Sequence, residues 1–483
     1  MTRLVTGVPG LDVVLGGGLD PGSVTVLAGA PGTGKTILAQ QICFANATEE
    51  RRAIYYSTMS EPHSKLVRHL APFSFFDVAA LGSAVEYIHL GDLLRGDLPD
   101  PLEPMVTEVV GKTMRDRPSV VVIDSARALR DFAGDRELRM AFYDLTSRLA
   151  HTDTALLLVG EYTEEEMAGG VEFSLADGII QLAYEAREPI DRRWLRTVKL
   201  RGTHHLEGKH TFRINPSGIE VYPRIETLDA DPPLAVTGRI GSGVPGLDAL
   251  LGGGIGRAEA TVVLGPSGVG KTIFGLRFVT EGLANDERSL YVTFQDTSDQ
   301  LVTMAAGFGW DLAAARADGR FVMHHVPLGE LDLDMLASHI REELAGGSIR
   351  RVVIDSLAEL VFATREGERF PAYARSLIGI IRSAGASLVI TSETTTLGPG
   401  PEPIGGVTFL FHNVILLRYI EMNSATGRAL NIVKMRNSDH DKNVHQFDIG
   451  AHGPEIGSAM EGVSGVLGWS ALRTTGSRRA ADG

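Results

Sequence analysis

The sequence is poor in cysteine and has no apolar stretch long enough to cross a membrane. Cys43 is its single cysteine, so no intrachain disulfide can form. We expect Cys43 to be a small buried hydrophobe, since it falls in a helical pattern. Apolar runs such as 155–159 have the length of a strand, and residues 1–7 lack the apolar core of a signal peptide. These features predict a cytoplasmic protein with no membrane partner.

Positive charge is also in deficit, with 46 Lys and Arg against 60 Asp and Glu and a net charge of −14. An acidic chain is a poor candidate for binding nucleic acid over its whole surface, because phosphate backbones are held by clustered Lys and Arg. A local basic groove remains compatible with this balance. The length of 483 residues predicts two or three domains, each large enough for its own core.

What the sequence does contain is a phosphate-binding motif. Gly29-Ala-Pro-Gly-Thr-Gly-Lys35-Thr36 fits G-x-x-x-x-G-K-[ST], the P-loop. Residues 23–28 before it are typical of a buried strand, and residues 36–45 after it of an amphipathic helix. This order of strand, glycine loop and helix is the setting that the motif requires.

The residue types of this loop suit ATP and Mg²⁺. Glycines let backbone N–H groups close around phosphate oxygens, and the helix N-terminus adds a positive dipole end. Lys35 can reach the β- and γ-phosphates, while the Thr36 hydroxyl can hold Mg²⁺. The predicted nucleotide-binding residues are Gly29, Gly32, Thr33, Gly34, Lys35 and Thr36.

The motif then recurs, with similar flanks, 271 − 35 = 236 residues later. Its predicted nucleotide-binding residues are Gly265, Gly268, Val269, Gly270, Lys271 and Thr272. The lead sequence Gly-Val-Pro-Gly-Leu-Asp at 7–12 recurs at 243–248 with the same offset. A period this long indicates two copies of one domain rather than a solenoid.

Strand and helix patterns alternate through both copies, which predicts an α/β fold with a parallel sheet covered on both faces. We expect a first domain at 1–225, a linker at 226–236 and a second domain at 237–470. The linker is acidic and rich in proline, and residues 471–483 are typical of a disordered tail.

In each half, two acids follow predicted strands, and each acid has a counterpart in the other half. Glu61 and Asp296 follow β-rich runs and lie 296 − 61 = 235 residues apart. An acid at this edge of a sheet can accept a proton from an attacking water, although a solvated loop acid is the alternative. Asp124 follows four apolar residues and Asp355 follows three, which is the Walker B pattern that holds Mg²⁺.

Each half closes with a predicted basic strand of the form Lys-x-Arg-x-[Ser/Thr]-x-His. Side chains two apart on a strand share a face, and two cations on one face suit a triphosphate. The alternative is a solvated charged face. The histidines lack a clean metal-ligand spacing, so we expect no metal held through histidine. The residues are Lys199, Arg201, Thr203 and His205 in the first half, and Lys434, Arg436, Ser438 and His440 in the second.

Taken together, the repeated lead, P-loops, Walker B strands and basic strands resemble the KaiC family, over about residues 5–470. The resemblance implies two tandem RecA-like P-loop domains, each a mostly parallel twisted sheet flanked by helices. It also implies a homohexamer of two stacked rings with ATP at subunit interfaces. The basic residues of one subunit would then act in trans on the nucleotide of its neighbour.

The sequence departs from the family in places that bear on function. The family carries two adjacent glutamates where this chain has Ser60-Glu61 and Gln295-Asp296. The family also autophosphorylates on adjacent Ser and Thr, and the register of 414–417 puts Thr408 and Phe409 there. One candidate phosphoacceptor, Thr408, therefore remains, and the final tail does not match the family's partner-binding tail.

Three functions compete at this point. The first is a KaiC-like ATPase hexamer that switches contacts with unidentified protein partners; Lys35, Lys271, Glu61 and Asp296 would be its catalytic residues. The second is a Ser/Thr autokinase that uses Thr408, as in a clock system. The third is a DNA-dependent motor of the RecA type, which is disfavoured because the loops 162–170 and 394–402 contain no Lys or Arg.

Overall fold

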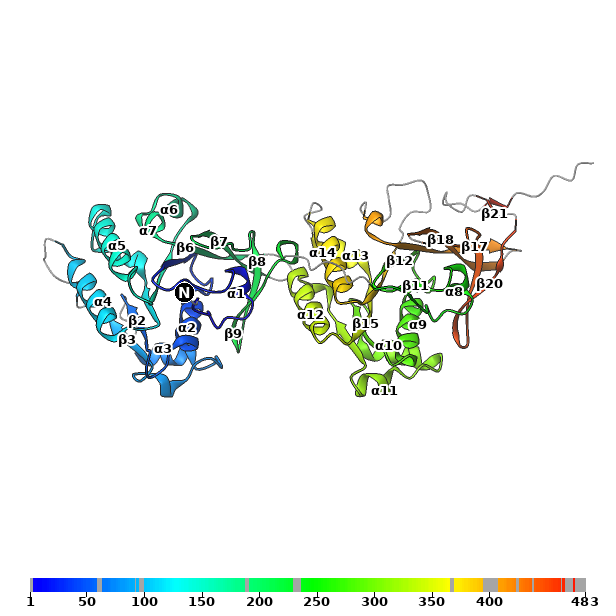
Figure 1. The fold of residues 1–483 in the computed structure, drawn as a ribbon, viewed down its shortest axis with the longest axis horizontal. Helices are drawn as coiled ribbons and strands as arrows, with labels where there is room; N and C mark the ends of the chain where they lie inside the picture. The colour runs from blue at the N-terminus through cyan, green and yellow to red at the C-terminus, as the bar shows by residue number, and fades with distance from the viewer. Residues whose placement is uncertain are drawn as a thin grey trace, which may run out of the picture. The chain divides into compact units, whose positions relative to one another are not determined.

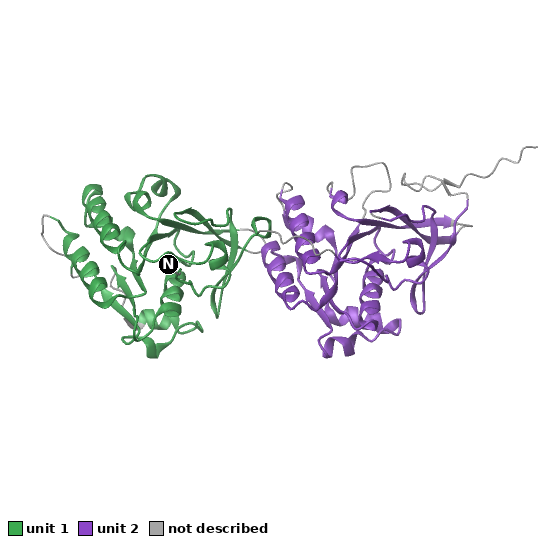
Figure 2. Cartoon of the chain, in the orientation of Figure 1, with its two compact units in different colours: residues 1–228 green, residues 229–483 purple. Residues whose placement is uncertain are grey.

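The structure is a computed structural model, in which the chain divides into two compact units, residues 1–228 and 229–483 (Figure 2). It describes residues 3–58, 63–91, 93–94, 100–186, 191–228, 236–364, 369–393, 407–422, 425–436, 438–461, 463–464 and 472–473. Each unit is described below by itself.

The described part of the first unit, which is coloured blue to green in Figure 1, contains a sheet of order β3-β2-β4-β5-β1-β6-β7-β8-β9. The six strands from β3 to β6 in this order are parallel, and the last three run antiparallel to their neighbours. In chain order they are β1 (Val24–Gly29), β2 (Ala53–Ser57), β3 (Val85–His89), β4 (Val120–Asp124), β5 (Ala155–Glu161), β6 (Gly178–Glu185), β7 (Arg192–Leu200), β8 (His210–Asn215) and β9 (Gly218–Tyr222).

Helices cover both faces of this sheet. They are α1 (Leu11–Val14), α2 (Lys35–Asn46), α3 (His63–Leu70), α4 (Glu103–Asp116), α5 (Asp135–Leu149), α6 (Glu164–Gly169) and α7 (Val171–Leu175), with 3₁₀ turns η1 (Val78–Ala80), η2 (Ala126–Asp131) and η3 (Ile225–Thr227).

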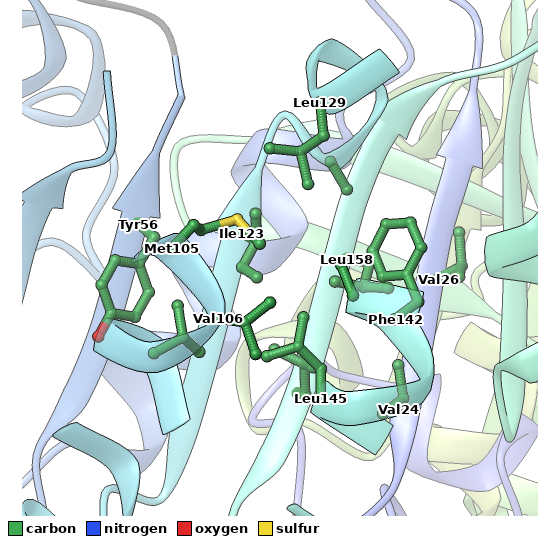
Figure 3. Packing of buried hydrophobic residues seen from close by; sticks show 14 of the residues in the cluster. Val24, Val26, Tyr56, Met105, Val106, Ile123, Leu129, Phe142, Leu145 and Leu158 are labelled. Carbon is green, nitrogen blue, oxygen red and sulfur yellow. The ribbon is translucent and has the colours of Figure 1, made fainter. Parts of the chain in front are cut away.

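Successive residues of the central strands pack into two different cores. Val121 and Ile123 of β4 join one cluster with Val106 of α4 and Leu145 of α5. Figure 3 shows Ile123, Val106 and Leu145 within this cluster. Their neighbours in β4 join a second cluster with residues of α2, including Cys43. Buried strands of β-branched and aliphatic residues therefore form a sheet with an apolar layer on each side.

Cys43 is fully buried, as we expected, and burial raises the pKa of its thiol.

The second unit repeats this arrangement with the strand order β14-β13-β15-β16-β12-β17-β18-β19-β20 in its described part. Its strands are β10 (Arg239–Ile240), β11 (Ile255–Gly256), β12 (Ala260–Gly265), β13 (Arg288–Thr293), β14 (Phe321–His325), β15 (Ile349–Asp355), β16 (Ser387–Glu393), β17 (Asn413–Met422), β18 (Ala425–Met435), β19 (His445–Gly450), β20 (Gly453–Ala459), β21 (Val463–Ser464) and β22 (Leu472–Arg473). Its helices are α8 (Leu247–Leu250), α9 (Lys271–Ala284), α10 (Ser298–Gly307), α11 (Leu312–Ala317), α12 (Leu333–Ala345), α13 (Leu357–Thr364) and α14 (Phe370–Ser383), with turns η4 (Leu328–Glu330) and η5 (Thr408–Leu410).

The predicted fold class is confirmed: each unit is a mostly parallel sheet flanked by helices. Within the described residues, no helix combines the length and the apolar character that crossing a membrane would require.

Two details differ from what we predicted. The basic strands do not close the halves, because two antiparallel strands follow each of them, β8 and β9 after β7, and β19 and β20 after β18. Part of the expected tail, residues 472–473, pairs with 463–464 as β22 with β21. The rest of that tail lies outside the described residues, as do residues 229–235 of the expected linker.

Candidate functional site

The carboxyl ends of the parallel strands bring the predicted site residues of each half together. In the first unit, the residue pairing places Asp124 at the end of β4 beside Ser57 of β2 and Val159 of β5. Gly29, at the end of β1, pairs with Glu161 of β5. The loop that follows β1 therefore lies at the same edge of the sheet as Asp124 and Glu161, which is where α/β proteins bind ligands.

The glycine before each P-loop lysine is required by the backbone. Gly34 precedes α2 with φ 100°, and a Cβ there would lie 2.9 Å from Ile214 Cδ1. Gly270 precedes α9 with φ 115°, and its Cβ would lie 2.7 Å from Ile449 Cδ1. Any other residue would be strained by both conformation and contact, so the glycine sets where each helix begins.

In the first site, the Thr36 hydroxyl donates to Asp124 Oδ2 at 2.9 Å, and the Tyr55 hydroxyl donates to the same oxygen at 2.5 Å. Lys35 Nζ donates to the carbonyl of Ala30 at 2.8 Å. The cavity around this group is lined by loop, strand-end and β3 residues: Gly32, Gly34, Lys35, Thr36, Ile37, Tyr55, Ser57, Leu66, Tyr87, Ile88, His89, Asp124, Ser125, Gly160, Glu161 and Ile214.

The second site repeats these contacts. The Thr272 hydroxyl donates to Asp355 Oδ2 at 2.8 Å, the Tyr291 hydroxyl donates to it at 3.0 Å, and Thr391 Oγ1 donates to Oδ1. Lys271 Nζ donates to the carbonyls of Gly265 and Pro266, each at 2.9 Å. Its cavity is lined by Ser267, Gly268, Gly270, Lys271, Thr272, Ile273, Thr293, Gln295, Asp296, Met304, Asp355, Ser356 and Glu393.

Four of the predicted P-loop residues shape the loops and do not line these cavities. Gly29 and Gly265 end the strands β1 and β12. Thr33 is fully buried, and its hydroxyl donates to the carbonyl of Ala30 at 2.9 Å. Val269 is also fully buried, within the apolar core of the second unit.

Burial controls the charges of the first site. It lowers the pKa of Lys35, against the opposing effect of the carboxylates of Glu161 and Asp124. It raises the pKa of Asp124, although hydrogen bonds from Tyr55 and Thr36 and the charge of Lys35 oppose the shift. Lys35 and Asp124 are thus poorly solvated. In such surroundings Lys35 would bind a phosphate strongly, and Asp124 would bind a cation strongly.

Sequence reasoning placed an acid after the second strand of each half. Asp296 lines the second cavity beside Gln295. Glu61 lies outside the described residues, so the same position in the first half stays a prediction.

The basic residues lie at the opposite edge of the sheet from the P-loop of their own unit. Lys199 pairs with Ile179 of β6, which itself pairs with Val26 near the start of β1. β7 ends at Leu200, so Arg201 lies just beyond the strand. Contrary to our expectation, Lys199 and Arg201 therefore do not share one face of a strand. The second half repeats this, because β18 ends one residue before Arg436.

Each basic pair nevertheless converges on one segment. Lys199 Nζ donates to the carbonyls of Phe173 and Ser174, both at 3.3 Å, and Arg201 pairs with Asp177 at 3.4 Å. Burial and the neighbouring charge of Arg201 lower the pKa of Lys199. The two positive charges therefore repel each other, and a bound anion would relieve that repulsion.

In the second half, Lys434 Nζ donates to the carbonyls of Thr408 at 3.2 Å and Phe411 at 2.9 Å. Arg436 donates to the carbonyl of Phe409 at 2.8 Å. Burial and the charge of Arg436 lower the pKa of Lys434.

The duplicated lead segments hold the loops that carry the remaining basic-strand residues. The N–H of Leu206 donates to the carbonyl of Val14 at 2.9 Å, and that of Asp441 to the carbonyl of Leu250 at 3.0 Å. Thr203, His205, Ser438 and His440 lie in these loops; the Thr203 hydroxyl contacts the carbonyl of His204, and the Ser438 hydroxyl that of Asp439. None of the four lines either cavity described above.

Several site residues escaped sequence reasoning. Tyr55 and Tyr291 hold the Walker B carboxylates from inside strands, where a tyrosine is indistinguishable from an ordinary core residue. Glu161 and Glu393 line the cavities from the ends of β5 and β16. Their signal was present in the sequence, because a glutamate follows the apolar run of this strand within a few residues in both halves.

The loop at 162–170, one of the two that contain no Lys or Arg, includes α6. Arg127 and Arg130 of η2 reach this region, where Arg127 contacts Glu166 at 3.2 Å and Arg130 contacts Glu172 at 2.9 Å. Each arginine is thus paired with a carboxylate. The second loop, residues 394–402, lies outside the described residues.

Comparisons with known proteins decide the family. The sequence model of the KaiC ATPase family matches residues 4–226 and again residues 240–461. The chain belongs to the KaiC ATPase family. Two matches, one in each unit, account for the duplicated motifs and for the repeated site.

Individual relatives are similar over nearly the whole chain, at low identity. A circadian clock protein KaiC3 from Synechocystis sp. is 27% identical over 98% of this chain and 95% of its own length. The circadian clock oscillator proteins KaiC of Acaryochloris marina and Synechococcus elongatus are 25% and 26% identical, each over 98% of this chain and 92% or 93% of their own length. The KaiC-type chain is therefore an ATPase by family, with nucleotide as its ligand.

The contacts of Asp124 predict a pH dependence of cation binding at the first site. A cation binds the carboxylate form, so protons compete with it, and the raised pKa moves that competition to higher pH. We expect Mg²⁺-dependent nucleotide binding in a Lys271→Ala protein to weaken as pH falls through the raised pKa, by up to about tenfold per pH unit. Titration of a fluorescent nucleotide against Mg²⁺ at several pH values measures this. Asp124→Asn should remove the pH dependence, and a flat profile in the parent would contradict the prediction.

Proposed function

We propose that this chain is an ATP-hydrolysing hexameric switch protein of the KaiC type, with one P-loop site in each domain. The observation that carries the proposal is the contact between the threonine after each P-loop lysine and the Walker B carboxylate. Thr36 meets Asp124 at 2.9 Å, and Thr272 meets Asp355 at 2.8 Å, each in a cavity lined by loop glycines. This geometry supports nucleotide binding in both domains.

The donor atoms at these contacts suit Mg²⁺. A threonine hydroxyl and a carboxylate oxygen are hard oxygen ligands, which Mg²⁺ prefers together with phosphate oxygens and water. Thr36 and Asp124 would hold it in the first site, and Thr272 and Asp355 in the second. When bound, Mg²⁺ supplies positive charge that neutralises the phosphates.

The residues of the chain then have distinct roles in hydrolysis. Lys35 and Lys271 bind the β- and γ-phosphates, and their burial strengthens that attraction. Asp296 takes a proton from the attacking water in the second site, and Glu61 does so in the first.

The basic pairs act in trans on a neighbouring subunit. Their position at the edge of the sheet opposite their own P-loop supports this, since they lie where β1 and β12 begin. In a ring, that edge of one subunit can face the nucleotide of the next. Lys199 with Arg201, and Lys434 with Arg436, would then stabilise charge that develops on the γ-phosphate.

Protein partners and the output of the switch are proposed from the relatives alone. The three relatives described above carry circadian clock names. We therefore propose a signalling role in the cytoplasm with unidentified protein partners. We do not propose nucleic acid as a partner, because the net charge is −14 and Arg127 and Arg130 already pair with carboxylates.

The two sites should hydrolyse ATP at different rates. Asp296 is one methylene shorter than Glu61, and a shortfall near 1 Å costs on the order of 10²-fold in rate. We expect a Lys271→Ala protein, which retains the first site, to release phosphate faster than a Lys35→Ala protein, which retains the second. Steady-state phosphate release from both full-length variants measures the difference. Equal turnover would contradict this assignment, and no turnover in either variant or the parent would contradict the proposed function.

Trans action predicts complementation between inactive subunits. We expect a Lys35→Ala/Lys271→Ala protein and a Lys199→Ala/Arg201→Ala/Lys434→Ala/Arg436→Ala protein to be nearly inactive alone. Mixed before assembly, some interfaces would combine an intact P-loop with an intact basic pair, so phosphate release should recover to a fraction of the parent rate. If the mixture stays as inactive as its components, the basic pairs do not act across subunits.

A second candidate activity, autophosphorylation, is favoured by the position of Thr408. Its carbonyl accepts a hydrogen bond from Lys434, and the adjacent carbonyl of Phe409 accepts one from Arg436. Thr408 therefore lies against the basic pair that we place near a neighbour's γ-phosphate. Transfer to its hydroxyl instead of to water would make the protein a Ser/Thr autokinase.

Peptide mass spectrometry after incubation with ATP and Mg²⁺ tests this second activity. We expect one phosphate at most per chain, at Thr408 and absent from Thr408→Ala, because Phe409 replaces the second acceptor. Steady phosphate release without any gain in protein mass would leave an ATPase and exclude the kinase. Thr408→Ser should retain phosphorylation, since it keeps the hydroxyl.

A further inference from the structure

A buried carboxylate lies directly behind the second nucleotide cavity. Glu359 of α13 is only 6% exposed and lies four residues after the Walker B Asp355. Its Oε2 accepts from the Ser356 hydroxyl at 2.5 Å and from the Ser356 N–H at 3.3 Å. Its Oε1 accepts from Gln295 Nε2 at 2.5 Å.

Part of this arrangement is a helix cap. A serine followed three residues later by glutamate is the pattern in which the acid returns to the N–H of the capping residue. That role explains the contact with the Ser356 N–H. It does not explain the contact with Gln295, which belongs to a different element, the segment after β13, and lies 64 residues away in sequence.

The chemistry of the two partners fixes the orientation of the glutamine. An ionised carboxylate only accepts hydrogen bonds, whereas an amide has one donating and one accepting end. Glu359 therefore selects the NH₂ end of Gln295, and Oε1 becomes the end available to the cavity. Gln295 lines that cavity together with Asp296 and Lys271.

We propose that Glu359 is a positioning residue of the second site, which fixes Gln295 so that its Oε1 orients the attacking water. This inference rests on the proposed ATPase function. In the step, the water oxygen bonds to the γ-phosphorus as the bond between that phosphorus and the oxygen of the ADP leaving group breaks. One water proton passes to Asp296. The other stays on the attacking oxygen, which becomes a phosphate oxygen, and that O–H donates to Gln295 Oε1, because an amide can accept a hydrogen bond but not a proton.

Glu359 lies close enough to the phosphate site to influence the pKa of Lys271. Burial lowers the pKa of Lys271, while the carboxylates of Glu393, Asp355 and Glu359 raise it. Glu359 is thus close enough to act electrostatically on the residue that binds the phosphates, yet it does not line the cavity itself.

The first half has no equivalent carboxylate at this place in its sequence. Ala128 lies four residues after Asp124, where Glu359 lies four residues after Asp355, and Ser60 stands where the second half has Gln295. The sequence therefore does not repeat this glutamine and glutamate pair in the first half. A glutamine without this anchor would rotate and present either end to the cavity.

The test uses full-length Lys35→Ala protein, in which the second site alone turns over. Glu359→Gln keeps an oxygen for the Ser356 cap but lets Gln295 reverse, because an amide at 359 can donate as well as accept. We expect kcat to fall about tenfold or more, with the KM for ATP nearly unchanged, since a water-orienting contact acts in the transition state. In a Gln295→Ala background, the same substitution should have no further effect on kcat.

Exchange of the two side chains gives a second, independent readout. In Gln295→Glu/Glu359→Gln the amide at 359 donates to the carboxylate at 295, which again leaves an acceptor facing the cavity. We expect this double variant to recover at least the parent kcat, whereas Gln295→Glu alone places two carboxylates together and loses activity.

Gln300 provides the matched control, because it closes the capping box at the start of α10 but does not line the cavity. Gln300→Glu makes the same exchange as Gln295→Glu, and the reverse of Glu359→Gln, at a helix cap, and it should leave kcat unchanged. An unaltered kcat in Glu359→Gln, or a multiplicative loss on top of Gln295→Ala, would overturn the positioning role while leaving the ATPase intact. A Lys35→Ala protein that hydrolyses no ATP would overturn turnover at the second site and the positioning role together.

Discussion

The contact between a threonine hydroxyl and a half-buried aspartate is the interaction on which both halves of this protein depend. It joins the first turn of the P-loop helix to the end of a neighbouring strand, at 2.9 Å in the first unit and 2.8 Å in the second. The two groups meet only because the parallel strands end at one edge and the loop glycine starts the helix at a fixed residue. The tyrosine hydroxyl on the same carboxylate and the buried lysine both rely on this placement.

On this common frame the two halves differ in their acids and amides. The first half has Glu61 preceded by serine, and the second has Asp296 preceded by a glutamine that a buried glutamate anchors. A shared backbone with different polar groups at the cavity is how duplicated domains acquire separate rates. Such a difference would let one site turn over slowly while the other follows faster changes in nucleotide.

Much of the fold could be predicted from the sequence, because the P-loops, the apolar strands and the repeat each leave a local pattern. The motif spacing likewise indicated that Asp124 and Asp355 end buried strands, whereas their contacts with Tyr55 and Tyr291 carried no such signal. The anchoring of Gln295 by Glu359 could not, since it joins residues 64 positions apart that carry no pattern of their own. The end of β7 at Leu200 was missed because Arg201 continues the alternation of polar residues past the last strand residue.

The alternate packing of strand residues into two cores also constrains how the two halves have diverged in length. A slip of one residue in β4 would move Val121 and Ile123 from one apolar layer to the other, so insertions can survive only between strands. The offsets between equivalent residues record this: 271 − 35 = 236 at the P-loops, 355 − 124 = 231 at the Walker B acids and 434 − 199 = 235 at the basic pairs. The connections before β4 and after β5, and their counterparts, are thus where the two halves differ in length.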